Sequence, residues 1–126
     1  MIRKLFQWAD KHIYLIKTVA VLWILMIIIL CLMPSPDIPS NYEIPFLDKI
    51  VHFTFYFVLC LFMLLIFKIP KWSTRIFLLV ILVFCFSLTI EIIQYIMPWE
   101  RSFSVADLVA NLSGIIAGII IFPKNL

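Results

Sequence analysis

The stretch that decides the fold is EIIQYIMPWERSFSVADLVANLSGIIAG, residues 91–118. Two apolar segments flank a short polar turn that contains Pro98. Proline lacks a backbone N–H and breaks helices, so the turn separates two predicted helices. A polar side chain at membrane depth is costly unless it has a partner or a function. Polar side chains in or beside its two apolar segments include Glu91, Gln94, Arg101, Ser104, Asp107 and Asn111.

The composition of the whole chain places this stretch in a membrane protein. Hydrophobic residues make up 65% of the 126 positions and charged residues 13%, with a mean hydropathy of +1.16. A soluble domain of this size cannot bury so much apolar surface. The basic residues form no run interleaved with aromatic ones, so we expect no nucleic-acid partner. We therefore predict one integral membrane domain, residues 1–126.

Prolines between the apolar segments set the number of predicted spans. A helix needs roughly 20 residues to cross a hydrocarbon core of about 30 Å. Four segments come close to that length, so the sequence predicts an all-α bundle of four transmembrane helices. They cover residues 13–33, 50–69, 76–97 and 105–122.

The first sixteen residues predict a short helix at the membrane surface, because apolar residues recur there at helical spacing among basic ones. A cleaved signal peptide is not expected. The apolar segment after Lys17 is too long, and no cleavage pattern of small residues follows it.

The distribution of lysine and arginine predicts the orientation. Eight of these residues flank the N-terminus, the second connection and the C-terminus, whereas only Lys49 and Arg101 lie on the opposite side. Cytoplasmic segments carry the excess of basic residues. We therefore expect a multi-pass protein of the cytoplasmic membrane with both termini inside, and with residues 34–47 and 98–104 outside.

Polar residues fall on one face of each of three predicted helices, at about 100° per residue. Glu91 lies roughly 10 Å from the Pro98 turn, and Asn111 lies a similar distance from Ser104. The spacing therefore predicts one polar pocket in the outer half of the bilayer. Its members are Asp48, His52 and Tyr56 in the second segment, Glu91, Gln94 and Tyr95 in the third, and Ser104, Asp107, Asn111, Gly114 and Gly118 in the fourth.

Several motifs in this order resemble the VanZ-like family of small bacterial membrane proteins, over residues 13–122. They are D-K-x-x-H-x-x-x-Y at 48–56, E-x-x-Q at 91–94, P-x-x-R-x-x-S-x-x-D at 98–107 and A-N-x-x-G at 110–114. The resemblance implies a compact four-helix membrane unit and no established reaction. The family is named after an accessory protein of glycopeptide-resistance clusters that lowers susceptibility to teicoplanin. The resemblance therefore also implies a role at the cell envelope and in antibiotic resistance.

Three residues are candidates for catalysis: Glu91, His52 and Asp107. A carboxyl group and an imidazole at the same depth can act as acid and base. The structural alternative is that Glu91 forms an interhelical bond that fixes packing, with His52, Arg101 or Lys49 as its partner. Both interpretations remain open at this stage.

Ser104 and Asp48 each have a structural alternative as well. Ser104 could join His52 and Asp107 in a nucleophilic triad, but an N-cap with Asp107 completing a capping box explains it more simply. For Asp48, we favour an N-cap of the second helix over an acid/base role. A metal site from Asp48, His52, Glu91 and Asp107 would be unspecific in its ligands, so we expect no metal and no cofactor.

The candidate ligand-binding residues surround these groups. The side chain of Arg101 can pair with Glu100 or Asp107, or offer a bidentate fork to an anionic headgroup. Small residues four apart favour close helix packing for Asn111, Gly114 and Gly118 over ligand contact. The full set is Asp48, Lys49, Tyr56, Gln94, Arg101, Ser104 and Asn111.

Three classes of function remain. The first is a protein that binds or modulates an envelope amphiphile, such as a lipid-linked intermediate, a phospholipid or a lipoglycopeptide. The second is a membrane enzyme that uses Glu91 and His52 on a lipid-linked substrate. The third is an accessory bundle whose polar groups only hold its helices together. The expected partner is the lipid bilayer, and the oligomeric state stays open.

Overall fold

The computed structural model describes residues 2–34, 46–71, 73–98 and 102–122. These ranges contain helices and no strand, as the sequence predicts. The five helices are α1 (Ile2–Lys11), α2 (Ile13–Leu32), α3 (Leu47–Phe67), α4 (Thr74–Ile96) and α5 (Val105–Ile121).

Three of the helices are long and apolar enough to cross a membrane. They are α2, α3 and α4, with 20, 21 and 23 residues. The predicted fourth span forms an apolar helix, α5, of only 17 residues. Its end has a local cause: Phe122 precedes Pro123 and is extended (ψ 138°), as the residue before a proline usually is. The structure thus supports a membrane protein, with three helices of full spanning length.

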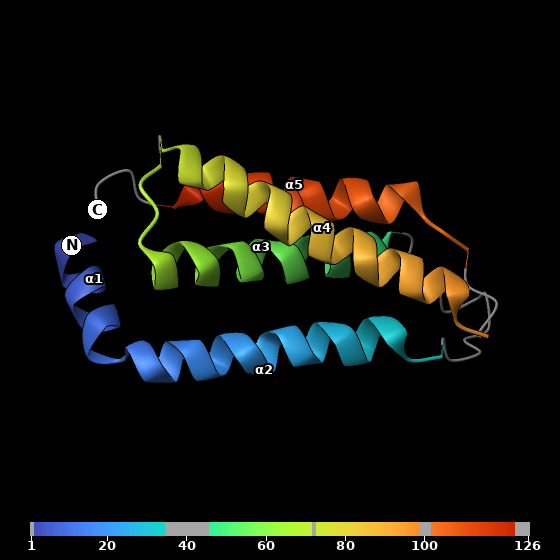
Figure 1. Cartoon of the computed structure of the whole chain (residues 1–126), viewed down its shortest axis with the longest axis horizontal. Helices are drawn as coiled ribbons and strands as arrows, with labels where there is room; N and C mark the ends of the chain where they lie inside the picture. Colours follow the sequence, from blue (N-terminus) through green and yellow to red (C-terminus); the bar gives the residue numbers. More distant parts are fainter. Residues whose placement is uncertain (1, 35–45, 72, 99–101, 123–126) are drawn as a thin grey trace.

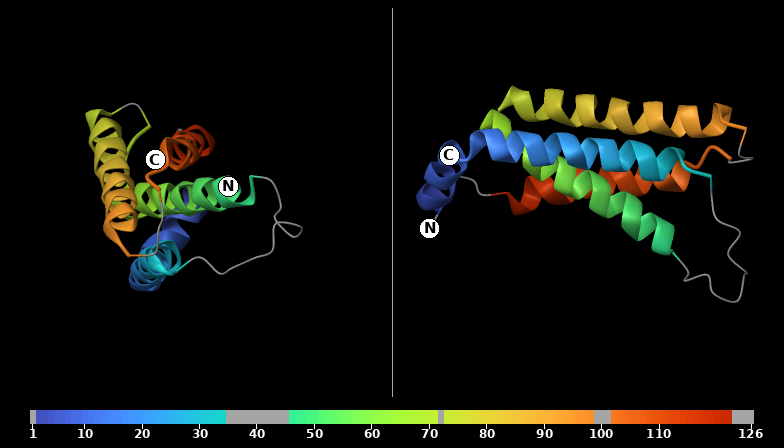
Figure 2. Two further views of the ribbon diagram at one scale, coloured as in Figure 1. Left: turned by 90° about the vertical axis from the view of Figure 1, so that its right-hand side faces the viewer. Right: turned by 90° about the horizontal axis from the view of Figure 1, so that it is seen from below.

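Helices α2 to α5 run lengthwise beside one another and alternate in direction (Figure 1). Seen end-on, α3 lies between α2 and α5, with α4 to one side (Figure 2). Helix α3 has its most extensive contact with α5, and it also packs against α2. The indole N–H of Trp23 in α2 donates to the carbonyl oxygen of Phe55 in α3 at 3.0 Å. The central helix therefore joins the bundle together.

Helix α1 lies across one end of the bundle (Figure 1). His12, with φ −113° and ψ 23°, separates it from α2. Ala9 is buried, and the ring of Phe6 meets the ring of Phe122 edge-on with centroids 6.0 Å apart. Lys68, after α3, pairs with Asp10 at 2.5 Å. Contacts from both ends of the sequence therefore meet at the same end of the bundle.

Two glycines let α5 approach α3 closely. A Cβ atom on Gly114 would clash with the carbonyl oxygen of Phe53, and it would lie 3.0 Å from the amide nitrogen of Phe57. A Cβ atom on Gly118 would lie 3.1 Å from Cβ of Cys60. Small residues four apart permit such contacts between helix backbones. The packing role predicted for these glycines is confirmed.

The outer surface of the helices is apolar. Exposed residues include Leu22 in α2, Leu82 in α4 and Ile120 in α5, each at least 58% accessible. So large an apolar surface on a protein of this size indicates contact with lipid.

The two ends of the bundle differ in their polar side chains. We call one the polar end: it contains the end of α2, the start of α3, the end of α4 and the start of α5. We call the other the basic end, after Lys68, Lys71 and Arg75 in and beside the α3–α4 connection. Each end carries a different candidate site.

Candidate functional site

Asp107 in α5 is the centre of the polar end. One carboxylate oxygen accepts a short hydrogen bond from Lys49 Nζ, and the other lies 3.9 Å from His52 Nε2. Lys49 Nζ also donates to Asp48 Oδ2 at 2.6 Å. Three residues near the start of α3 are therefore joined to the first turn of α5. We call Asp48, Lys49, His52, Asp107 and Asn111 the polar cluster.

The two ring nitrogens of His52 face different partners. Nδ1 lies 3.1 Å from Asn111 Oδ1. An amide oxygen can only accept, so this bond assigns the proton to Nδ1. Nε2 then faces Asp107 Oδ2. Asn111 thus orients the imidazole as well as packing against α3.

Glu91 in α4 has a partner that the sequence interpretation missed. Its side chain is 1% exposed, and Oε1 accepts the backbone N–H of Ser104 at 2.7 Å. The predicted partners were His52, Arg101 or Lys49. The sequence can indicate that the backbone N–H groups at the start of a helix need acceptors. Which side chain accepts from them depends on how α4 lies beside α5.

Ser104 is the N-cap of α5, as predicted, because its hydroxyl accepts the backbone N–H of Asp107 at 3.2 Å. The capping box was only half right. In such a box the third residue of the helix binds back to the N-cap N–H. Here Glu91 takes that place, so the Asp107 carboxylate is free to bind Lys49.

The N-cap interpretation of Asp48 is wrong. Helix α3 begins earlier than the predicted residue 50, its N-cap is Phe46 (φ 62°), and no side chain caps it. Asp48 lies in the first turn with its side chain 65% exposed and paired with Lys49. A carboxylate there still interacts favourably with the helix dipole.

Gln94 joins α4 to the end of α2. Its side-chain N–H donates to the carbonyl oxygen of Cys31 at 2.5 Å. The last four carbonyls of a helix have no intrahelical donor, so this bond satisfies one of them. Tyr95, predicted on the same face as Gln94, is 63% exposed, whereas Gln94 is buried.

Tyr56, a predicted ligand contact, is buried inside the bundle. It is 1% exposed and packs against Phe86, with ring centroids 6.2 Å apart. Its hydroxyl has no hydrogen-bond partner within the described part of the chain. Arg101 lies outside the described residues, and its predicted role stays a prediction.

A groove of about 340 Å³ opens beside the polar cluster. Volumes of this order suit small ligands and parts of larger ones. Helix α2 contributes Leu30 and Cys31, which no polar pattern in residues 13–33 could have indicated. The lining residues are Leu30, Cys31, Leu47, Asp48, Val51, His52, Phe55 and Gln94. The groove is thus mainly apolar, with polar groups from α3 and α4.

Two chemical alternatives gain no support. Among the described residues, no three His, Cys, Asp or Glu side chains lie together as a metal site. Both ring nitrogens of His52 face other partners, while the Ser104 hydroxyl accepts from a backbone N–H. The geometry is therefore that of a helix cap and not of a nucleophilic triad.

Comparison with known proteins agrees with the motifs. The VanZ/LLP1 family profile matches residues 17–125, nearly the whole chain. No curated protein and no solved structure matches it. A match over this length includes the polar cluster, the groove and the Ser104 cap. The chain belongs to the VanZ/LLP1 family.

Proposed function

We propose that the polar end binds the headgroup of an envelope amphiphile, and that through this binding the protein influences glycopeptide susceptibility. The candidate ligands are a lipid-linked cell-wall intermediate, a phospholipid and a lipoglycopeptide. The observation that carries the proposal is the position of the polar cluster beside a groove that is otherwise apolar. An amphiphile has a polar headgroup and an apolar chain, so its binding site needs a polar surface beside an apolar one.

The proposal includes a membrane topology. We propose one integral domain, residues 1–126, with four spans in the cytoplasmic membrane and both termini in the cytoplasm. The excess of basic residues near the basic end supports this orientation. The lengthwise position of α5 beside three full-length helices supports the fourth span (Figure 1). The polar end then faces the outer leaflet.

Lys49 is the cation that an anionic headgroup would engage. Two carboxylates share it, but Asp48 is largely exposed, and an exposed ion pair contributes little to stability. A phosphate can therefore replace Asp48 on Lys49 at small cost, while Asp107 keeps the ammonium group in place. Arg101 is proposed as a second cation.

The test uses the protein in nanodiscs with three probes: a polyprenyl diphosphate, phosphatidylglycerol and teicoplanin. We expect Lys49→Gln to weaken retention of the bound probe roughly tenfold, the scale of a lost charge-assisted hydrogen bond. Lys49→Arg should restore most of it. Retention by the unmodified protein should also fall as salt rises.

The control is Thr54→Ala, on an exposed face of α3, where the hydroxyl only binds the Ile50 carbonyl of its own helix. Unchanged retention of all three probes by Lys49→Gln would refute the proposal. A loss that merely follows the amount of folded protein would show that the polar groups serve packing alone.

A second candidate is a membrane enzyme acting on a lipid-linked substrate. It is favoured by His52, which lines the groove while Asn111 holds its Nδ1–H. Glu91 and His52 would be acid and base, with Asp107 beside the imidazole. Glu91→Gln separates the structural role of this side chain from an acid role. The glutamine oxygen still accepts the Ser104 N–H, but the side chain no longer exchanges a proton. Lost turnover with normal folding would favour this reaction, and retained turnover would exclude Glu91 as the acid.

A further inference from the structure

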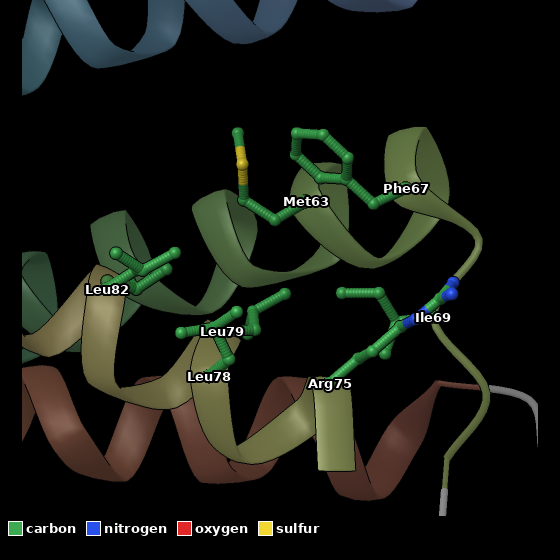
Figure 3. A pocket seen from close by; sticks show the side chains of 8 residues that line it. Met63, Phe67, Ile69, Arg75, Leu78, Leu79 and Leu82 are labelled. Atoms are coloured by element: carbon green, nitrogen blue, oxygen red, sulfur yellow. The ribbon is translucent and has the colours of Figure 1, made fainter. Parts of the chain in front are cut away.

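A second groove lies at the basic end, between the last turns of α3 and the first turns of α4. Its volume is about 360 Å³. Met63 and Phe67 lie on the α3 side and Leu78 and Leu82 on the α4 side, with the Arg75 guanidinium at one end (Figure 3). Arg75 is the only charged residue among those that line it.

The length of this groove suits one leaflet of a bilayer. The groove residues of α4 run from Arg75 to Val83. At 1.5 Å per residue, this part of the helix is about 12 Å long. Half of a hydrocarbon core of about 30 Å is about 15 Å. The apolar wall therefore runs from the membrane surface through most of one leaflet.

Arg75 is available to a ligand. Its side chain is exposed, and the guanidinium makes no hydrogen bond or ion pair with the described part of the chain. Its basic neighbours are engaged: Lys68 pairs with Asp10, and Lys71 donates to the carbonyl oxygens of Ile120 and Phe122. A guanidinium presents a planar fork of donors that matches a phosphate.

We propose that this groove holds an acyl chain of an anionic glycerophospholipid, with the lipid phosphate bound by Arg75. The site takes lipid from the leaflet at the basic end, opposite the polar cluster. It does not depend on the function proposed for the polar end. The charge of Arg75 selects anionic over zwitterionic lipid, and the apolar walls supply contact with the chain.

The experiment measures which lipids stay bound to the full chain after extraction from nanodiscs that contain equal parts of phosphatidylglycerol and phosphatidylcholine. We expect the unmodified protein to retain phosphatidylglycerol preferentially. Arg75→Gln should reduce that preference roughly fivefold to tenfold. Leu82→Trp, which fills the groove without changing the charge, should reduce the retention of both lipids.

Lys17→Gln is the matched control, because Lys17 is an exposed cation of α2 outside the groove. An equal loss of preference in Lys17→Gln and Arg75→Gln would overturn the proposal in favour of general attraction between charges. Unchanged retention in Leu82→Trp would overturn it as well. Displacement of the lipid by inorganic phosphate alone would also overturn it, because the site would then bind phosphate without the acyl chain.

Discussion

At the scale of single residues, the three carboxylates among the described residues of the polar end have three different roles. Asp48 is exposed and forms an ion pair with Lys49. Asp107 lies between Lys49 and His52. Glu91 accepts a hydrogen bond from the backbone N–H of Ser104. Because Glu91 satisfies the backbone N–H of Ser104, the Asp107 side chain is not needed for that bond and can pair with Lys49 instead. One buried side chain of α4 therefore sets the chemistry available in α5.

This division of tasks predicts different results for two Glu91 variants. Glu91→Gln keeps the acceptor for the Ser104 N–H and should change stability little. Glu91→Ala leaves that N–H without a partner and should cost roughly 1–3 kcal/mol. Thermal unfolding in detergent measures both, with Thr89→Val on the exposed face of α4 as the control. Equal losses in the two Glu91 variants would contradict the cap.

The buried hydroxyl of Tyr56 supports a second prediction. It has no partner among the described residues, and burying an unpaired polar group is unfavourable. Tyr56→Phe keeps the ring against Phe86 and should leave the unfolding temperature equal or higher. Tyr14→Phe, at an exposed position, is the control. A loss above about 1 kcal/mol would show that the hydroxyl has a hydrogen-bond partner.

At the scale of helices, the contact between α3 and α5 positions the site. His52 and Asn111 meet on the face where two glycines, one and two turns farther along α5, let the backbones of α3 and α5 lie close together. At the opposite end, Lys71 binds the final carbonyls of α5. Both ends of α5 are thus held by groups outside it.

The glycines predict an order of severity. Gly114→Ala places a methyl group against the Phe53 backbone and should cost about 1–3 kcal/mol, as overpacking does. Gly118→Ala meets mainly the Cys60 side chain and gains helix propensity of about 1 kcal/mol, so its net effect should be smaller. Unfolding temperatures of the two variants test the order. The reverse order would contradict the packing described for α5.

At the scale of the whole molecule, the alternation of four lengthwise helices separates two unlike ends. The polar cluster lies at one end, and the exposed Arg75 lies at the other. A membrane would place each end at a different surface. The two sites that we propose would then lie in different leaflets.

The topology can be tested with a membrane-impermeant maleimide on intact cells. Ser102→Cys, exposed near the polar end, should be labelled without opening the membrane. Ser73→Cys, at the basic end, should be labelled only after the membrane is opened. The unmodified chain is the control, because its three cysteines lie inside helices. Labelling of Ser73→Cys in intact cells would invert the proposed orientation.

The sequence by itself determined the helices and the cap at Ser104. Apolar periodicity, proline and capping are local properties, and the predicted bounds of the lengthwise helices differ from the observed ones by at most three residues. Only the tertiary structure decided that Glu91 completes that cap, that Asp48 binds Lys49 instead of capping α3, and that α2 lines the groove. These outcomes depend on how each helix is rotated and which helix lies beside it, and close packing of distant segments sets both.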